Sequence, residues 1–117
     1  EGGCPGVFWM SKNLGASQVA TSSTDAAAFG ALYQWGRTKD GHQLRNSSLT
    51  PLNATSATDN PGHSDFILRT IAPYDWRNPQ NNNLWQGALG INNPCPDGFR
   101  IPTAGEFDCE RLSWSSD

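Results

Sequence analysis

Several side chains that could act as a nucleophile or as an acid or base lie in one stretch near the end of the chain, NPCPDGFRIPTAGEFDCERL, residues 93–112. A cysteine acts as a nucleophile when a nearby base, here His42 or His63, lowers the pKa of its thiol. Two carboxylates that face each other across a cleft hydrolyse glycosidic bonds. The stretch supplies candidates for both reactions, namely Cys95, Cys109, Asp97, Glu106, Asp108 and Glu110.

The elements that hold these acids give them a structural explanation. Thr103 and Glu106 form the pattern Thr-x-x-Glu, a capping box, and it predicts a helix over residues 104–112. Asp97 begins an Asp-Gly turn, and the other two acids fall on the solvated face of that helix. We therefore predict no catalytic residue and a protein that is not an enzyme. An oxidase or hydrolase is the minor alternative.

A first helix is predicted over residues 25–35. Asp25 lies in its first turn, where the helix dipole favours an acid, and three alanines follow. Phe29, Leu32 and Tyr33 then fall on one face.

Short extended segments are predicted at residues 7–10, 65–68 and 99–101, where small apolar groups stand between turn signals. Residues 37–63 are rich in Ser, Thr, Asn and Pro, so they predict a long surface loop or a mobile insertion. The expected fold class is α+β.

The composition excludes several classes of function. The chain has 117 residues, which suits one domain, and 8 basic against 11 acidic residues give a net charge of −3. Without a basic run, we expect no nucleic-acid partner. No apolar run approaches the roughly 18 residues of a membrane helix, so we expect no membrane insertion. Few lysines, many Asn and Ser and three cysteines favour an extracellular or cell-surface protein.

Metal and cofactor sites have weak support. With two histidines and no Cys-x-x-Cys pattern, the sequence predicts no zinc site and no cofactor. A structural calcium ion is the one alternative, held by oxygens of Asp59, Asn60, Asp65 and Asp75. The three cysteines, Cys4, Cys95 and Cys109, allow three pairings and leave one thiol over.

The tryptophans divide into two groups. Trp9 and Trp35 fall in predicted regular elements and are expected to be buried. Trp76 and Trp85 fall in polar, Asn-rich loops. A ring in such a loop can stack on a ligand, so the predicted ligand-binding residues are Trp76, Trp85, Asn82 and Asn83.

Four stretches together resemble a known family. FWMSKNLGAS at 8–17, FGALYQWGRTKDGHQ at 29–43, PYDWRNPQNNNLWQG at 73–87 and NNPCPDGFRIPTAGEF at 92–107 resemble the Fibrobacter succinogenes major paralogous domain. The resemblance extends over residues 8–114. The piece RIPTAGEF at 100–107 is less specific on its own, because the related formylglycine-generating enzymes carry a similar segment.

The resemblance implies a C-type-lectin-like fold with two helices, a small antiparallel sheet and long loops. It also implies that residues 1–117 are a single, truncated domain, because members continue well past this point and the C-terminal half is absent here. Members are secreted or surface-displayed proteins of bacteria and phages. Cys95 is placed to pair with a late family cysteine, so Cys4 becomes its expected partner and Cys109 the remaining thiol.

Two functions follow as hypotheses. The first is a non-enzymatic, extracellular, lectin-like module that recognises a glycan or a protein, or that serves in display. The second is a structural subunit of a pilus, filament or virion surface, in which self-assembly or a second chain completes the fold.

Overall fold

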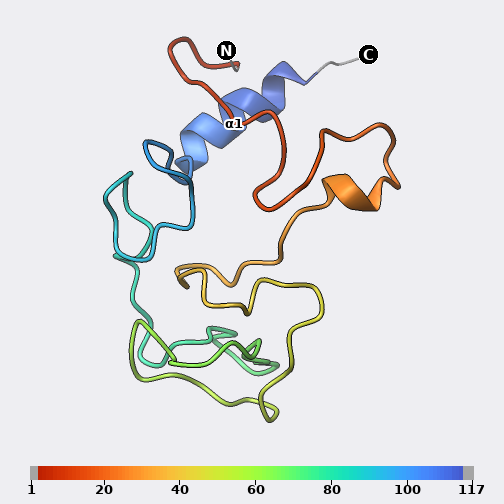
Figure 1. The fold of residues 1–117 in the computed structure, drawn as a ribbon. Coiled ribbons are helices and arrows are strands. Elements are labelled where there is room, and N and C mark those ends of the chain that lie inside the picture. Colours follow the sequence, from red (N-terminus) through yellow and green to blue (C-terminus); the bar gives the residue numbers. More distant parts are fainter. Residues whose placement is uncertain (1–2, 115–117) are drawn as a thin grey trace. The chain divides into compact units, whose positions relative to one another are not determined.

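The structure, a computed structural model, describes residues 3–114 of the chain. Its regular elements in this part are a single turn of 3-10 helix, η1, at Ala26–Ala28 and one α-helix, α1, at Ala104–Ser113. Figure 1 shows η1 in orange, α1 in blue and loops between them. The predicted α+β fold with two helices and an antiparallel sheet is therefore wrong, and the chain is mostly loops and turns.

The chain divides into two compact units. The terminal unit combines Glu1–Gly30 with Pro102–Asp117, and the central unit is Ala31–Ile101. The central unit is thus an insertion between the two segments of the terminal unit. The single domain expected from the chain length stays a prediction.

The predicted helix over residues 104–112 is confirmed, and its start is set by the capping box. The Thr103 hydroxyl accepts a hydrogen bond from the Glu106 backbone N–H at 3.2 Å, and the Glu106 carboxylate accepts one from the Thr103 backbone N–H at 2.9 Å. Two N–H groups that the helix leaves without partners are satisfied in this way. Local sequence alone therefore specifies where α1 begins.

A disulfide between Cys4 and Cys109 ties the start of the chain to α1. Beside it, the Gly3 backbone N–H donates to the Glu110 carboxylate at 2.6 Å. The two backbones approach so closely that a Cβ atom on Gly3 would lie 2.6 Å from the Cys109 carbonyl oxygen. The expected pairing of Cys4 with Cys95 is wrong, and Cys95 is the cysteine with a free thiol.

Aromatic rings complete the packing of the terminal unit. Trp9 meets Phe107 edge-on at 6.4 Å between ring centres, and Phe107 meets Trp114 edge-on at 6.1 Å. Trp9 is only partly buried, although the sequence predicted a buried ring. α1 buries none of its residues fully, and it is attached through the Trp9–Phe107 contact, the disulfide and the Gly3–Glu110 hydrogen bond.

The predicted helix over residues 25–35 is wrong beyond its first turn. Asp25, expected in the first turn, is instead the N-cap of η1 and accepts the Ala27 backbone N–H. Gly30 then has a φ of +75°, a left-handed conformation that ends the turn. Beyond it, the Leu32 N–H donates to the Gln43 carbonyl and the Gln34 N–H donates to the His42 ring. These donors are no longer available to a helix.

The three predicted strands do not form in the described residues. Within residues 3–114, the ladder contacts are two isolated parallel bridges, Leu49 with Phe66 and Ser56 with Arg77. Side chains take the place of neighbouring strands. The Gln34 side-chain amide pairs with both the N–H and the carbonyl of Ile67 at 2.9 Å, and the Asn53 side chain accepts the Thr70 N–H at 2.7 Å. Such local bonds compete with a sheet.

The core of the central unit is small. Its buried apolar cluster consists of Ile67, Trp76 and Leu84. Gly36 lies against it in a left-handed conformation, φ +81°, where a Cβ atom would lie 2.9 Å from the Leu84 side chain. Arg37, His42 and Gln43 are buried as well. Among the described residues, no helix has the length and hydrophobicity needed to cross a membrane.

The disulfide is expected to stabilise the terminal unit strongly. Cys4 and Cys109 lie 105 residues apart in the sequence, so replacing Cys109 by serine should lower the free energy of unfolding by about 2–5 kcal/mol in chemical denaturation. Cys95→Ser is the control and should change it by at most about 1 kcal/mol. Equal stability of the two variants would contradict the pairing, as would alkylation of three thiols in the unreduced chain.

Candidate functional site: a pocket beside a buried arginine

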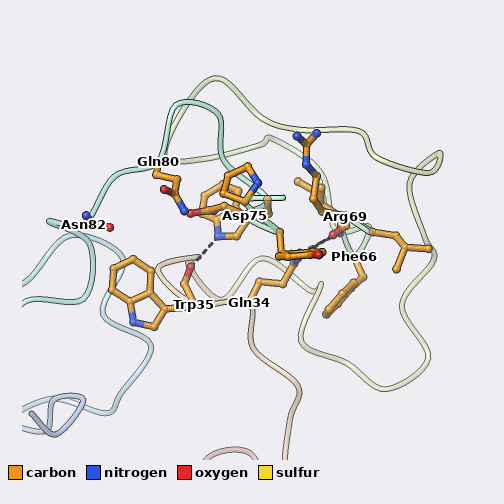
Figure 2. Close-up of a pocket in the computed structure, with 12 residues that line it drawn as sticks. Gln34, Trp35, Phe66, Arg69, Asp75, Gln80 and Asn82 are labelled. Carbon is orange, nitrogen blue, oxygen red and sulfur yellow. Dashed lines mark hydrogen bonds between the residues drawn. The ribbon is translucent and has the colours of Figure 1, made fainter. Parts of the chain in front are cut away.

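The central unit contains a pocket of about 480 Å³. This volume falls within the range of roughly 300–1,000 Å³ that is usual for small-molecule sites. In the view of Figure 2, Trp35 and Asn82 lie at one end of the pocket, and Phe66 and Arg69 lie at the other. The lining combines aromatic rings with amide, carboxylate and guanidinium groups, among them Trp35, Arg69, Tyr74, Asp75, Gln80 and Asn82.

Arg37 lies beside the pocket, against the lining residues Gln34 and Trp76, and has no exposed surface. Its guanidinium donates to the Asp40 carboxylate at 2.8 Å and to the Gln34 side-chain oxygen at 2.9 Å. It also donates to the carbonyls of Asp65 and His63, at 2.8 and 2.7 Å. Burying a charge is costly unless it is paired and hydrogen-bonded, and these four contacts meet that condition. They join two parts of the chain, residues 34–40 and residues 63–65.

Asp40 links Arg37 to a second buried group, the ring of His42. The Asp40 carboxylate lies 2.7 Å from His42 Nδ1 and also accepts the His42 backbone N–H. Burial acts to raise the pKa of Asp40, but the bonds from His42 and Arg37 outweigh it and hold that pKa below its usual value. The carboxylate therefore stays ionised at neutral pH and fixes the orientation of both neighbours.

The bonds of His42 define its protonation state. Nε2 accepts the backbone N–H of Gln34 at 3.1 Å, so this nitrogen carries no proton. Nδ1 then bears the ring proton and donates it to Asp40. Burial lowers the pKa of His42, against the opposing pull of Asp40. His42 is a neutral structural group at neutral pH, and its ring is not exposed to a substrate.

Two buried tryptophans, Trp76 in the pocket lining and Trp85 outside it, hold Trp35 in place. The Trp76 ring is buried, lies 5.9 Å from the Arg37 guanidinium and donates its indole N–H to the Trp35 carbonyl at 2.7 Å. Figure 2 shows this bond as a dashed line. Trp85 is buried too, and its indole N–H donates to the Arg37 carbonyl at 3.2 Å. The Trp85 ring packs 5.9 Å from that of Trp35, so it holds the exposed ring in place.

Tyr74 is presented to solvent by a strained backbone. Its φ is +64°, a left-handed conformation that costs a residue with a side chain roughly 1–2 kcal/mol. Its side chain is mostly exposed, so burial of the ring does not offset this cost. Strained residues tend to persist where the surrounding structure imposes them, often at functional sites. Tyr74 is therefore a candidate contact for a ligand.

Arg69 and Asp75 bring opposite charges to the pocket wall. Arg69 donates from Nη1 to the Asn53 carbonyl at 3.1 Å, and its buried Nε–H has no partner within residues 3–114. One Asp75 oxygen accepts the Arg77 backbone N–H at 3.0 Å. The pocket thus offers hydrogen-bond donors and acceptors without a strong net charge.

The structure separates the four residues predicted to bind a ligand. Trp76 and Asn82 line the pocket. Trp85 lies behind Trp35, and Asn83 donates its backbone N–H to Asn81 outside the lining. Their role in binding stays a prediction. Trp35, expected to be buried, is 46% exposed and lines the pocket instead.

Sequence reasoning also missed Gln34, Arg69, Tyr74, Asp75 and Gln80 as lining residues. The only local signal was the density of aromatic and amide residues in the stretch 73–87.

The predicted calcium ligands serve other roles in the structure. Asp59 accepts from Arg77 at 2.6 Å and from Asn81 at 3.0 Å, and the Asn60 side chain accepts the Gly62 N–H. No group of three or more metal-binding side chains occurs in the part of the chain that the structure describes. A structural calcium ion remains an untested prediction.

The cysteines are not arranged as activated nucleophiles. Cys109 is consumed by the disulfide, and burial raises the pKa of the Cys95 thiol above its usual 9.0. A raised pKa keeps a thiol protonated at neutral pH, whereas nucleophilic catalysis needs the thiolate.

Comparison of the chain with protein-family models, with curated protein sequences and with solved structures finds no match. The resemblance to the Fibrobacter succinogenes major paralogous domain therefore stays a hypothesis.

Arg37 is expected to carry a large share of the stability of the central unit. Arg37→Met keeps the length of the side chain but leaves Asp40 and two backbone carbonyls without their donor. It should cost about 3–5 kcal/mol in urea denaturation. Arg37→Lys should recover little, because one ammonium cannot reach all four acceptors.

Arg111→Met is the control for Arg37. Arg111 pairs with Asp108 on the exposed surface of α1 at 3.3 Å. Such a pair contributes roughly 0–1 kcal/mol, so the control should change stability very little. A cost for Arg37→Met no greater than for Arg111→Met would show that the buried network is not what holds the central unit.

Proposed function

We propose that this protein is a non-enzymatic, extracellular recognition module that binds a glycan in the pocket of the central unit. The observation that carries the proposal is the presentation of two exposed rings, Trp35 and Tyr74, in a pocket whose lining also includes amide, carboxylate and guanidinium groups. The proposal keeps the recognition function predicted from the sequence and not the predicted lectin-like fold.

The chemistry of a sugar matches such a lining. A pyranose ring has an apolar face of C–H groups that packs on an aromatic ring, and its hydroxyls both donate and accept hydrogen bonds. Gln80 and Asn82 offer both kinds of partner, and the Asp75 carboxylate accepts. An aromatic ring with few rotatable bonds gives contact area at low entropic cost. The pocket volume of about 480 Å³ suits a small ligand better than a flat protein surface.

The disulfide supports the proposed extracellular location of the protein. Disulfides persist in oxidising compartments and are rare in the reducing cytosol. The Cys4–Cys109 bridge therefore agrees with secretion or surface display.

A glycan array with the full chain tests the proposal, followed by calorimetry on any saccharide that binds. Tyr74→Gly is the most informative variant, because glycine relieves the left-handed strain while removing the ring. The variant should unfold within about 1 kcal/mol of the unaltered chain but bind at least about tenfold more weakly.

Trp114→Ala is the matched control, since it removes an exposed ring in the terminal unit. It should leave the affinity unchanged. An array on which no saccharide binds would overturn the proposed function, as would equal affinity of Tyr74→Gly and the unaltered chain.

A second candidate function is a subunit of an assembly such as a filament, pilus or virion surface. It is favoured by the apolar side chains that the terminal unit leaves exposed, namely Phe8, Phe107, Leu112 and Trp114. α1 has no fully buried residue, although a helix in a finished domain normally buries one face. Copies of the same chain that cover this helix would bury that surface.

Light scattering across a dilution series tests the second candidate. Assembly predicts a mass that rises with concentration above that of one chain. Leu112→Gln should suppress this rise without lowering stability, since the side chain is exposed. Leu89→Gln, at a fully exposed position of the central unit, is the control and should leave the rise unchanged. A constant single-chain mass would argue against assembly.

A further inference from the structure

We infer that the pocket is coupled to pH through His42, whose neutral ring holds one wall of the pocket in place and whose protonation loosens that wall. The inference rests on the proposed function, because it describes regulation of the same site. It is carried by the geometry of His42, which bonds through both ring nitrogens and has no exposed surface.

Protonation would turn one of these bonds into a repulsive contact. Nε2 accepts the Gln34 backbone N–H at 3.1 Å. A proton on Nε2 would place two donors face to face at that distance. Water cannot separate or solvate them in the closed structure, because the ring is fully buried. A protonated His42 therefore requires Gln34 or the imidazole to move.

Gln34 transmits this movement to the pocket. Its side chain pairs with both backbone polar groups of Ile67, a core residue that also lines the pocket. The neighbouring residue Trp35 presents the exposed ring, and its carbonyl accepts the Trp76 indole N–H. Displacement of Gln34 thus disturbs the wall formed by residues 34–35 and 66–68.

The groups around His42 explain why the pocket wall should lose stability in acid and not in base. Asp40 and Arg37 are the charged groups, Tyr33 is a titratable neighbour whose ring lies 5.8 Å away, and Phe66 packs at 6.4 Å. Burial is the largest influence, and it lowers the pKa of His42 below its ordinary 6.5, with Arg37 acting in the same direction and Asp40 against both. The folded state therefore binds fewer protons than the open state in acid. Stability of the wall is full above pH 6.5 and falls as the pH drops below that value.

Amide hydrogen exchange of the full chain tests the inference without a ligand. Between about pH 7.5 and about pH 5, after correction for the intrinsic rate, protection of the Gln34 and Ile67 amides should fall at least about threefold and at most about thirtyfold. The Asn78 amide, bonded to the Ser56 carbonyl in the same unit, is the internal reference and should change less. A change below about twofold, or an equal change at Asn78, would overturn the inference.

His42→Gln and His63→Gln form a matched pair of variants. Glutamine at position 42 places an oxygen where Nε2 accepts and does not titrate. His42→Gln should therefore remove the pH dependence of the protection of the Gln34 amide. His63 is exposed, and its replacement should leave that pH dependence unchanged.

Nitrogen NMR of the unaltered protein provides a test that does not depend on a variant folding. It should find the His42 proton on Nδ1 at neutral pH. A proton on Nε2 would overturn the inference.

A failure of the proposed glycan binding can be told apart from a failure of the pH coupling. If a saccharide binds, its affinity should weaken in acid by a factor similar to the loss of protection, and His42→Gln should bind equally well at both pH values. Binding that does not change with pH would overturn the coupling. If no saccharide binds but the Gln34 amide still loses protection in acid, the coupling is supported and the proposed glycan function fails.

Discussion

The buried guanidinium of Arg37 is the interaction on which the central unit depends. Its charge is removed from water, and four acceptors from two parts of the chain, 34–40 and 63–65, compensate for that loss. Two of the acceptors are the carbonyls of His63 and Asp65, at the far end of the segment that begins beside Arg37 itself. The polar stretch 37–63, which looks like an unattached loop in the sequence, is therefore closed at its base by one side chain.

The position of the pocket follows from the same arginine. Gln34 Oε1 is shared by Arg37 and the Ile67 N–H, and the Trp76 ring lies beside the guanidinium with its indole N–H on the Trp35 carbonyl. The segments on both sides of the pocket, 34–35 and 67–76, are thus positioned by the same buried charge. A core of three apolar residues is too small to orient these segments by packing alone. Directional bonds provide the geometry that a sheet supplies in most domains.

The parts of the structure that the sequence could predict are those whose bonds are local. The capping box of Thr103 and Glu106 predicts α1, whereas Asp25, expected in the first turn of the earlier helix, is the N-cap of η1. The helix prediction failed beyond Gly30 because the donors at 32 and 34 bond to Gln43 and His42, a contact that periodicity cannot reveal. The candidate site was found in part, through the Asn- and Trp-rich stretch that supplies Trp76 and Asn82. Trp35 was assigned to the core because its segment was read as a helix.

Side-chain amides explain how a chain with so little regular structure satisfies its backbone. The Asn92 amide donates to the carbonyls of Gly36 and Asp59, and the Asn93 amide donates to those of Ala88 and Phe99. Each amide replaces a partner that a neighbouring strand would provide. The abundance of Asn therefore helps the loops of the central unit to satisfy their backbone carbonyls. Because Arg37 and His42 share the Asp40 carboxylate, protonation of His42 would disturb this polar network more directly than it would disturb an apolar core.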